Sequence, residues 1–347
     1  MDQSIQVAVD IAPAQPHDGT TLASCLCPLL RAVGRPEWSM ARLQGVMGHA
    51  FHFEMVAGGG NVMHDNIDWG PALDFLPQFA QFRSFKATKH DTDVDLPTLK
   101  QDARDAVRAG LERGFPTLVW QPMSREQKAS DRPAHHAYCW GLIVGYNEPE
   151  ESYTVRHPFV DGTYTVRFDL IGHADPAELF SILAYAGPST ADEREVHVTA
   201  LRNAVGFAHA TRFEADDERN ARRRAAPHGF AAYELWREAF AAEDVPTFSS
   251  HHHIEVLLGR RLAAATYLRE IKTLFPDAAA QLEAAATHYD HEMAVLNPLH
   301  DLCDTACERQ AWPAQDRAEA RRLIGDALQA DREAIASIEA ALANIGD

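Results

Sequence analysis

Positive charge is scarce in this chain of 347 residues, which carries 50 acidic residues against 32 basic ones and a formal net charge of −18. Such an excess of negative charge repels nucleic acid and anionic membrane surfaces. Long apolar runs are also missing, because no stretch approaches the roughly 20 residues that span a bilayer. The first residues lack the basic region and apolar core of a signal peptide. We therefore expect a cytoplasmic protein with neither nucleic acid nor membrane as a partner.

Cysteine is scarce as well: there are five, an odd number, and they lack the paired spacing of a disulfide framework or a zinc site. We expect them to be reduced thiols. The glycine run 58–60 lacks the Lys-Ser/Thr that completes a phosphate-binding loop, and the H-E-x-x-H pattern of zinc peptidases is missing too. We therefore predict no cofactor and no metal.

Histidine, by contrast, is abundant, with 18 residues. If the segment 48–56 is a strand, alternation puts His52 and Glu54 on one face. The run 249–255 opens a helix with three consecutive histidines, and His288 has helical spacing to His291 and Glu292. Solvated or hydrogen-bonding histidines are the simpler interpretation, but a histidine-ligated metal enzyme is kept as a weaker alternative.

The order of the expected elements predicts an α+β fold. The first half shows helical patterns and then a run of strands, which favours an antiparallel sheet. After about residue 190 the strand signals end and only helical spacing is left. We predict helices at 20–34, 38–46, 69–82, 95–114, 195–213, 230–243, 250–275, 277–303 and 314–344, and strands at 48–56, 116–121, 138–146, 153–155, 163–168 and 180–186. The predicted domains are 1–192, with the sheet, and 193–347, an all-α helical bundle.

Three motifs occur in an order that resembles a known family. A cysteine-bearing helix ends at Gly34 and is followed by G-H-A-F at 48–51. The strand G-F-P-T-L-V-W follows at 114–120, and W-G-L-I-V-G-Y stands at 140–146. The chain resembles the family related to butirosin biosynthesis protein H, whose N-terminal domain is similar to C39-type cysteine peptidases. The start of the helical half, G-F-A-A-Y-E-L-W at 229–236, resembles the appended domain of some relatives.

The resemblance implies a papain-like N-terminal domain and thiol chemistry. In that family a cysteine at a helix N-terminus takes an acyl group, often from a carrier protein, and passes it to an amine. A helix N-terminus lowers the pKa of a thiol, an imidazole removes its proton, and a third residue orients the ring.

This sequence departs from the family at each of the three catalytic positions. Counted back from Gly34, the nucleophile position is Thr21, and the histidine and aspartate positions hold Cys139 and His157. A small shift of the alignment would restore Cys25 as nucleophile and His136 as base. A relocated pair of Cys139 and His157 is a second interpretation, and loss of covalent catalysis is a third.

We therefore predict an acyl- or aminoacyl-transferase of specialised metabolism. Its partners would be an acyl carrier protein, or a small-molecule acyl donor, and an amine acceptor. The alternative is a catalytically degenerate papain-like protein that binds a ligand or a partner. A homodimer formed through the helical domain is also left open.

Overall fold

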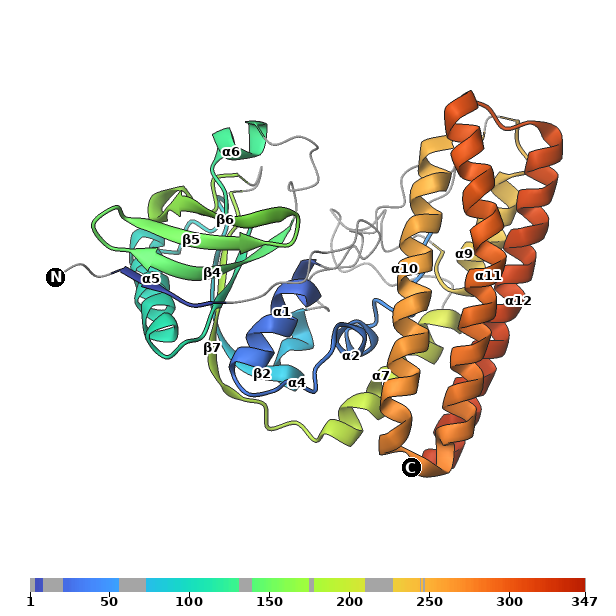
Figure 1. The fold of residues 1–347 in the computed structure, drawn as a ribbon, viewed down its shortest axis with the longest axis horizontal. Helices are drawn as coiled ribbons and strands as arrows, with labels where there is room; N and C mark the ends of the chain where they lie inside the picture. Colours follow the sequence, from blue (N-terminus) through green and yellow to red (C-terminus); the bar gives the residue numbers. More distant parts are fainter. Residues whose placement is uncertain are drawn as a thin grey trace. The chain divides into compact units, whose positions relative to one another are not determined.

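The computed structural model describes residues 4–8, 21–55, 73–130, 139–174, 178–209, 227–243, 245 and 247–346. Its chain divides into two compact units (Figure 1). The first holds Met1–Pro16, Thr20–Met40 and Leu76–Ala191, and the second holds His17–Gly19, Ala41–Phe75 and Asp192–Asp347.

The first unit is built on an antiparallel sheet with the strand order β2-β7-β3-β4-β5-β6, and β1 pairs with β4. Its elements are β1 (Ser4–Gln6), α1 (Thr21–Ala32), α4 (Leu76–Phe79), β2 (Ala80–Ala87), α5 (Leu96–Glu112), β3 (Thr117–Trp120), α6 (Arg125–Ser130), β4 (Trp140–Asn147), β5 (Ser152–His157), β6 (Val160–Arg167), the 3-10 turn η3 (Phe168–Leu170) and β7 (Phe180–Pro188). Short connections join β4, β5 and β6, which form the meander seen in Figure 1.

Helix α5 covers one face of this sheet. Asp95 caps its N-terminus by accepting the backbone N–H of Thr98, and Pro97 stands in the first turn, where its missing N–H costs nothing. Its apolar stripe packs on sheet residues in one buried cluster, in which Val107 joins Val119 and Ile143. Burial of this stripe holds the helix against the sheet, since the rest of its surface is charged.

The two glycines of the W-G-L-I-V-G-Y motif let other chain segments approach β4 closely. A Cβ placed on Gly141 would lie 2.7 Å from Pro122 Cγ, and one on Gly145 would lie 2.6 Å from the Ile5 carbonyl oxygen. Real side chains do not tolerate such contacts, so the loop after β3 and strand β1 both require glycine at these positions. The motif therefore encodes packing around β4 as well as the strand itself.

The second unit is helical and contains a chain segment from the N-terminal part of the sequence. Its elements are α2 (Met40–Val46), α7 (Glu193–His209), α9 (Phe230–Ala239), α10 (Thr247–Ile271), the 3-10 turns η4 (Lys272–Leu274) and η5 (Pro276–Ala278), α11 (Ala279–Arg309) and α12 (Ala314–Ile345). Helices α10, α11 and α12 lie side by side in Figure 1, and α9 packs on α12. Phe53 packs against Tyr233 with ring centroids 4.6 Å apart and the rings tilted by 52°, so the segment before residue 55 is part of this core.

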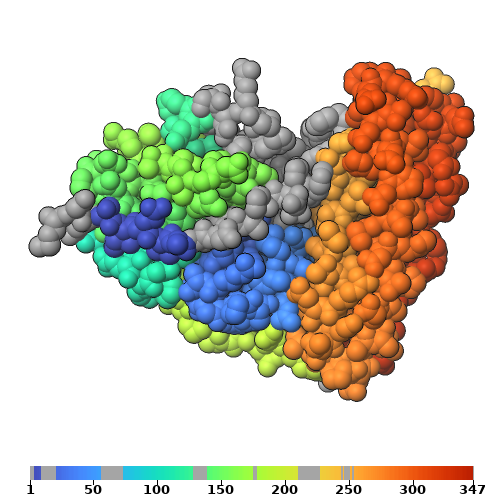
Figure 2. All heavy atoms as spheres, in the orientation of Figure 1, coloured from blue at the N-terminus to red at the C-terminus, as the bar shows by residue number. Residues whose placement is uncertain are grey.

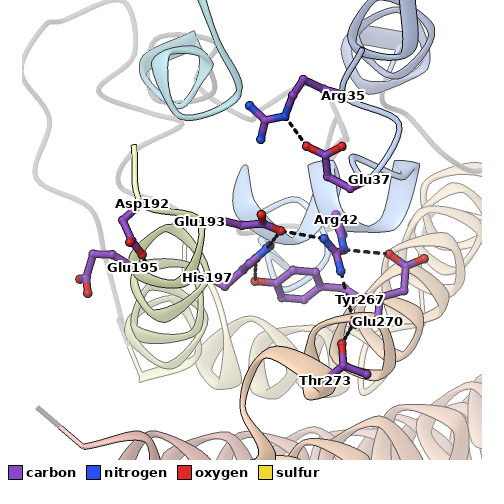
Figure 3. Close-up of polar contacts among 10 residues, drawn as sticks. All are labelled: Arg35, Glu37, Arg42, Asp192, Glu193, Glu195, His197, Tyr267, Glu270 and Thr273. Carbon is purple, nitrogen blue, oxygen red and sulfur yellow. Dashed lines mark hydrogen bonds and ion pairs between the residues drawn. The ribbon is translucent and has the colours of Figure 1, made fainter. Parts of the chain in front are cut away.

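Two arginines connect the elements of this unit. Arg42 on α2 pairs with Glu193 of α7 at 3.0 Å and with Glu270 of α10 at 3.5 Å (Figure 3). Arg261 on α10 is buried and binds Glu292 of α11 and Asp331 of α12, at 3.0 and 3.1 Å. A buried charge needs such partners, because an isolated one would be strongly destabilising.

The predicted α+β class, the antiparallel sheet and the C-terminal helical bundle are confirmed. The strands predicted at 138–146 and 153–155 are β4 and β5, which pair antiparallel, and β4 is buried on both faces. Within the described helices, none combines the length and the apolarity that crossing a bilayer requires.

One local prediction was wrong, and a second was right only in part. The segment 48–56 is not a strand where it is described: its early residues turn, and Glu54 makes only an isolated bridge to His228. Its described side chains are all buried, so the segment lacks the alternation of one buried and one exposed face that the strand prediction assumed. The helix expected at 69–82 agrees with its described residues up to Phe79, where α4 ends, but strand β2 begins at Ala80 and pairs with β7 about 100 residues later in the chain. Non-local pairing overrides local helical spacing there.

The compact units also differ from the predicted domain limits. The boundary near residue 192 separates the sheet from α7, but the described residues 41–55 belong to the helical unit. Residues 41–55 were predicted to be part of the first domain, but they pack in the helical unit.

Candidate functional site

Trp140, the first residue of β4, is held at both backbone polar groups by side chains of α1. Its N–H donates to Thr21 Oγ1 at 2.9 Å, and its carbonyl oxygen accepts the Cys25 thiol proton from Sγ at 3.4 Å. Thr21 and Cys25 are one helical turn apart, so they lie on the same face of α1. The N-terminal end of α1 is therefore fixed to the start of β4.

Cys25 itself is in surroundings that keep its thiol protonated. It is fully buried, and burial raises its pKa well above the ordinary value, with Cys139 acting in the same direction. The thiolate is the nucleophilic form of cysteine, so a protonated thiol that donates to a carbonyl reacts slowly. These contacts give Cys25 the properties of a structural residue.

Gln121 was not singled out by the sequence, yet it has the most unusual environment near this strand. It follows β3 directly, and its backbone N–H donates to the Cys139 carbonyl oxygen at 2.9 Å. Its φ is +41°, in the left-handed region that residues other than glycine seldom adopt. Its side chain is fully buried, and neither the amide nitrogen nor the amide oxygen has a hydrogen-bond partner among the described residues.

These features make Gln121 costly to the fold. A buried polar group without a partner costs about 1–3 kcal/mol, and a left-handed backbone adds strain of similar size. Costs of this kind gather at functional sites, where the strained or unpartnered group meets a ligand. The signal in the sequence is modest: a glutamine between the apolar strand T-L-V-W and Pro122.

His157 ends β5 at the same edge of the sheet. The pairing of Leu142 with Arg156 puts His157 opposite Gly141, two residues along β4 from Cys139. The imidazole is buried, and its Nδ1 accepts the backbone N–H of Phe159 at 3.3 Å. In a neutral ring that accepts at Nδ1, the proton is on Nε2. The ring is therefore arranged to donate a hydrogen bond from Nε2.

The structure thus brings four of the considered residues to one end of β3, β4 and β5, namely Thr21, Cys25, Cys139 and His157. Gln121 joins them through its bond to the backbone of Cys139. His136 lies in the segment 131–138, outside the described residues. Cys139 is buried, with 4% of its surface exposed. The chemistry present is an amide with a donor and an acceptor, an imidazole donor and two thiols.

A second group of buried polar residues lies in the helical unit. His52 Nε2 is 3.7 Å from Glu54 Oε2, and Arg260 donates to the His52 carbonyl oxygen at 2.7 Å. Burial lowers the pKa of His49 to about 3, and the positive charge of Arg260 acts in the same direction. Both ring nitrogens of His49 are without a hydrogen-bond partner in the described part of the chain. The group is thus a buried set of polar side chains, in which His49 and His52 are kept neutral beside Glu54 and Arg260.

His288 has helical spacing to His291 and Glu292, but its polar partner lies on another helix. His288 Nδ1 pairs with Glu333 of α12 at 3.2 Å, whereas the Glu292 carboxylate is buried against Arg261. On the same helix, His300 joins His251 and Glu255 of α10 in a group whose donor atoms lie within 4.8 Å of one another. The repeated i, i+4 spacing of His251 with Glu255 and His300 with Asp304 is the sequence signal that would have found it.

Comparison with known proteins adds no assignment, since no family model and no curated protein matches this chain.

Proposed function

We propose that the first unit binds a ligand that carries an amide or acyl carbonyl group, at the end of β3, β4 and β5, without covalent catalysis by Cys25. The main support for this proposal is that the buried side-chain amide of Gln121 lacks a hydrogen-bond partner among the described residues. A ligand carbonyl accepts from the Gln121 amide nitrogen, and a ligand N–H donates to its amide oxygen.

The contacts of α1 support binding over thiol catalysis. The hydroxyl of Thr21 occupies the family's nucleophile position and accepts the Trp140 N–H. Burial favours the protonated thiol of Cys25, and Nδ1 of His157 already accepts the backbone N–H of Phe159. The resemblance to the butirosin biosynthesis protein H family then describes a retained scaffold, whose ligand would be the acyl group of a carrier protein or of a small molecule.

Ligand binding is tested with a panel of acyl and aminoacyl N-acetylcysteamine thioesters and the matching primary amides. For at least one member we expect saturable, reversible binding that falls more than about tenfold in Gln121→Leu, because the amide supplies the paired hydrogen bonds. The same variant should unfold at a higher denaturant concentration, by about 1 kcal/mol in stability, since two unsatisfied groups are removed. Gln81→Leu, on an exposed position of β2, is the control for both measurements. Unchanged affinity in Gln121→Leu would refute the site.

The acyltransferase is the second candidate, and its support is the position of Cys139. The thiol belongs to the residue whose carbonyl oxygen accepts the Gln121 backbone N–H. An acyl-enzyme at Cys139 would therefore form near Gln121, whose side-chain amide nitrogen has no hydrogen-bond partner among the described residues. Attack by the thiolate would release the donor's thiol and form a thioester, which an amine then cleaves to give the amide.

Iodoacetamide labelling at neutral pH separates the two candidates. Cys307 is partly exposed, while the other four cysteines are buried, so accessibility alone makes Cys307 the fastest to label. We expect this order, with no acyl adduct in intact-mass spectra after incubation with the thioesters. Faster labelling of Cys139, together with an adduct that is lost in Cys139→Ala, would establish the acyltransferase instead.

A further inference from the structure

Helices α10 and α11 present a group of histidines and carboxylates at partly exposed positions. His251 and Glu255 are one turn apart on α10, and His300 and Asp304 are one turn apart on α11. Their side chains are between 21% and 50% exposed. Figure 2 shows the two helices, in yellow-orange and orange, side by side at the surface.

The distances within the group fit the coordination of one metal ion. One donor atom each from His251, Glu255 and His300 lies within 4.8 Å of the others. His251 Nδ1 is 3.7 Å from Glu255 Oε2, and the two imidazole centroids are 5.1 Å apart. A tetrahedral zinc ion with bonds of 2.0–2.2 Å needs donors about 3.4 Å apart, which small side-chain rotations supply here.

The Asp304 carboxylate lies near one ring nitrogen of each of the two imidazoles, His251 and His300. Its Oδ1 is 2.7 Å from His251 Nε2, and its Oδ2 is 3.5 Å from His300 Nδ1. A carboxylate that accepts the N–H of a metal-bound histidine fixes the ring's tautomer and orientation and increases its basicity. With Asp304 in that role, His251 Nδ1 and His300 Nε2 are the nitrogens left to bind metal.

We propose that His251, Glu255 and His300 bind a divalent ion of the zinc class, with Asp304 orienting both histidines. Three protein ligands leave a fourth position for water or a substrate oxygen, as in zinc sites that perform chemistry. Imidazole and carboxylate together suit Zn²⁺, whereas Mg²⁺ and Ca²⁺ prefer oxygen alone. The ion would also link α10 to α11, as metals do between bundle helices. This proposal is independent of the ligand site in the first unit.

The simplest rival is a set of ion pairs between protonated histidines and carboxylates, which needs no metal. His288 with Glu333 is such a pair on the same unit, with similar exposure and an N–O distance of 3.2 Å. Among the described residues, neither His288 nor Glu333 belongs to a group of three or more potential metal ligands. His288→Ala is therefore a matched control for His300→Ala.

The test is equilibrium dialysis of the full chain, without any affinity tag, against ZnCl₂ and separately MgCl₂, with metal analysis of the protein. We expect one Zn²⁺ per chain, no comparable Mg²⁺ binding, and a loss of affinity of more than about tenfold in His300→Ala. Asp304→Asn should weaken binding by a smaller factor, and His288→Ala should leave it unchanged. Circular dichroism checks that each variant keeps its helix content.

Co²⁺ provides a readout of geometry, because histidine and carboxylate ligands in a tetrahedral site give intense visible absorption. We expect that absorption in the wild type and its loss in His300→Ala. Equal Zn²⁺ affinity in His300→Ala and His288→Ala would overturn the proposal, because binding would then not depend on His300. Absence of saturable binding in the wild type would overturn it as well.

Discussion

At the scale of single residues, this protein keeps neutral several groups that would be charged or reactive in water. Burial raises the thiol pKa of Cys25 and lowers the imidazole pKa values of His49 and His52. His197 is a further case: its pKa falls to about 4 in the cluster of Figure 3, where Nδ1 lies 3.0 Å from the Tyr267 hydroxyl. Such groups make stability depend on pH, since the unfolded chain titrates them normally.

The pH dependence from His49 has a definite sign. Its pKa falls from 6.5 in the unfolded chain to about 3 in the folded protein. Below pH 6.5 the unfolded state therefore binds more protons, and stability is lost as the pH falls toward 3. Between pH 6.5 and about 5 the loss from this one residue is on the order of 2 kcal/mol.

His49→Leu should therefore reduce the loss of stability on acidification. Urea unfolding at several pH values between 7 and 5 measures it, and His90→Leu, at an exposed loop position, is the control. A pH dependence of His49→Leu identical to that of the wild type would show that His49 does not remain neutral in the fold.

At the scale of elements, close contacts decide where glycine is required. Gly45 lies in α2, and a Cβ there would be 2.4 Å from the ring of Tyr267. Tyr267 is fully buried, and its hydroxyl is bound to His197, so the ring has no room to yield. Gly206 lies at an exposed position of α7, and a Cβ there meets nothing within 4 Å.

The same substitution should therefore have opposite effects at these two positions. We expect Gly45→Ala to destabilise the protein by about 1–3 kcal/mol through overpacking. We expect Gly206→Ala to stabilise it by about 0.5–1 kcal/mol, because alanine is the better helix former. Denaturant midpoints of the two variants measure this. A gain in stability for Gly45→Ala would contradict the tight contact with Tyr267.

At the scale of the whole molecule, the chain enters the helical unit twice. Residues 41–55 come before most of the sheet in sequence, but they complete the helical core through Phe53 and Met55. The same segment supplies the Ala50 carbonyl oxygen to Arg261 at 3.2 Å and the Phe53 carbonyl oxygen to the Gly229 N–H at 2.8 Å. A boundary at residue 192 alone would leave these groups without partners.

A fragment of residues 193–347 should consequently fail to unfold cooperatively. The missing segment exposes core side chains and removes an acceptor from a buried arginine, each of which costs several kcal/mol. The same fragment preceded by residues 41–55 on a flexible linker should recover a cooperative transition in thermal unfolding followed by circular dichroism. Cooperative unfolding of the shorter fragment at the same temperature would contradict this partition.

The sequence was sufficient where local pattern and tertiary role agree. Helix α5 is marked by its Asp95 cap, its proline in the first turn and its regular apolar stripe, and it forms as expected. Strand β4 has a continuous apolar run because it is central and buried on both faces. The long helices α10, α11 and α12 follow from helical spacing over many turns.

The sequence misled where distant partners decide the outcome. Strand β2 exists because it pairs with β7, and the segment at Phe53 is irregular because helices surround it. At the candidate site, Cys25 has the thiol that catalysis needs, but burial raises its pKa and favours the protonated form. Residue spacing along the chain does not show this burial.

By itself, the sequence determined the α+β class, the helical second half and the set of side chains able to do chemistry. Periodicity and capping act over a few residues, so they can be read along the chain. Only the tertiary structure decided which of those side chains meet: Gln121 beside Cys139, and His251 beside His300. Burial and geometry set the protonation and reactivity of such groups, and both arise from contacts between segments far apart in sequence.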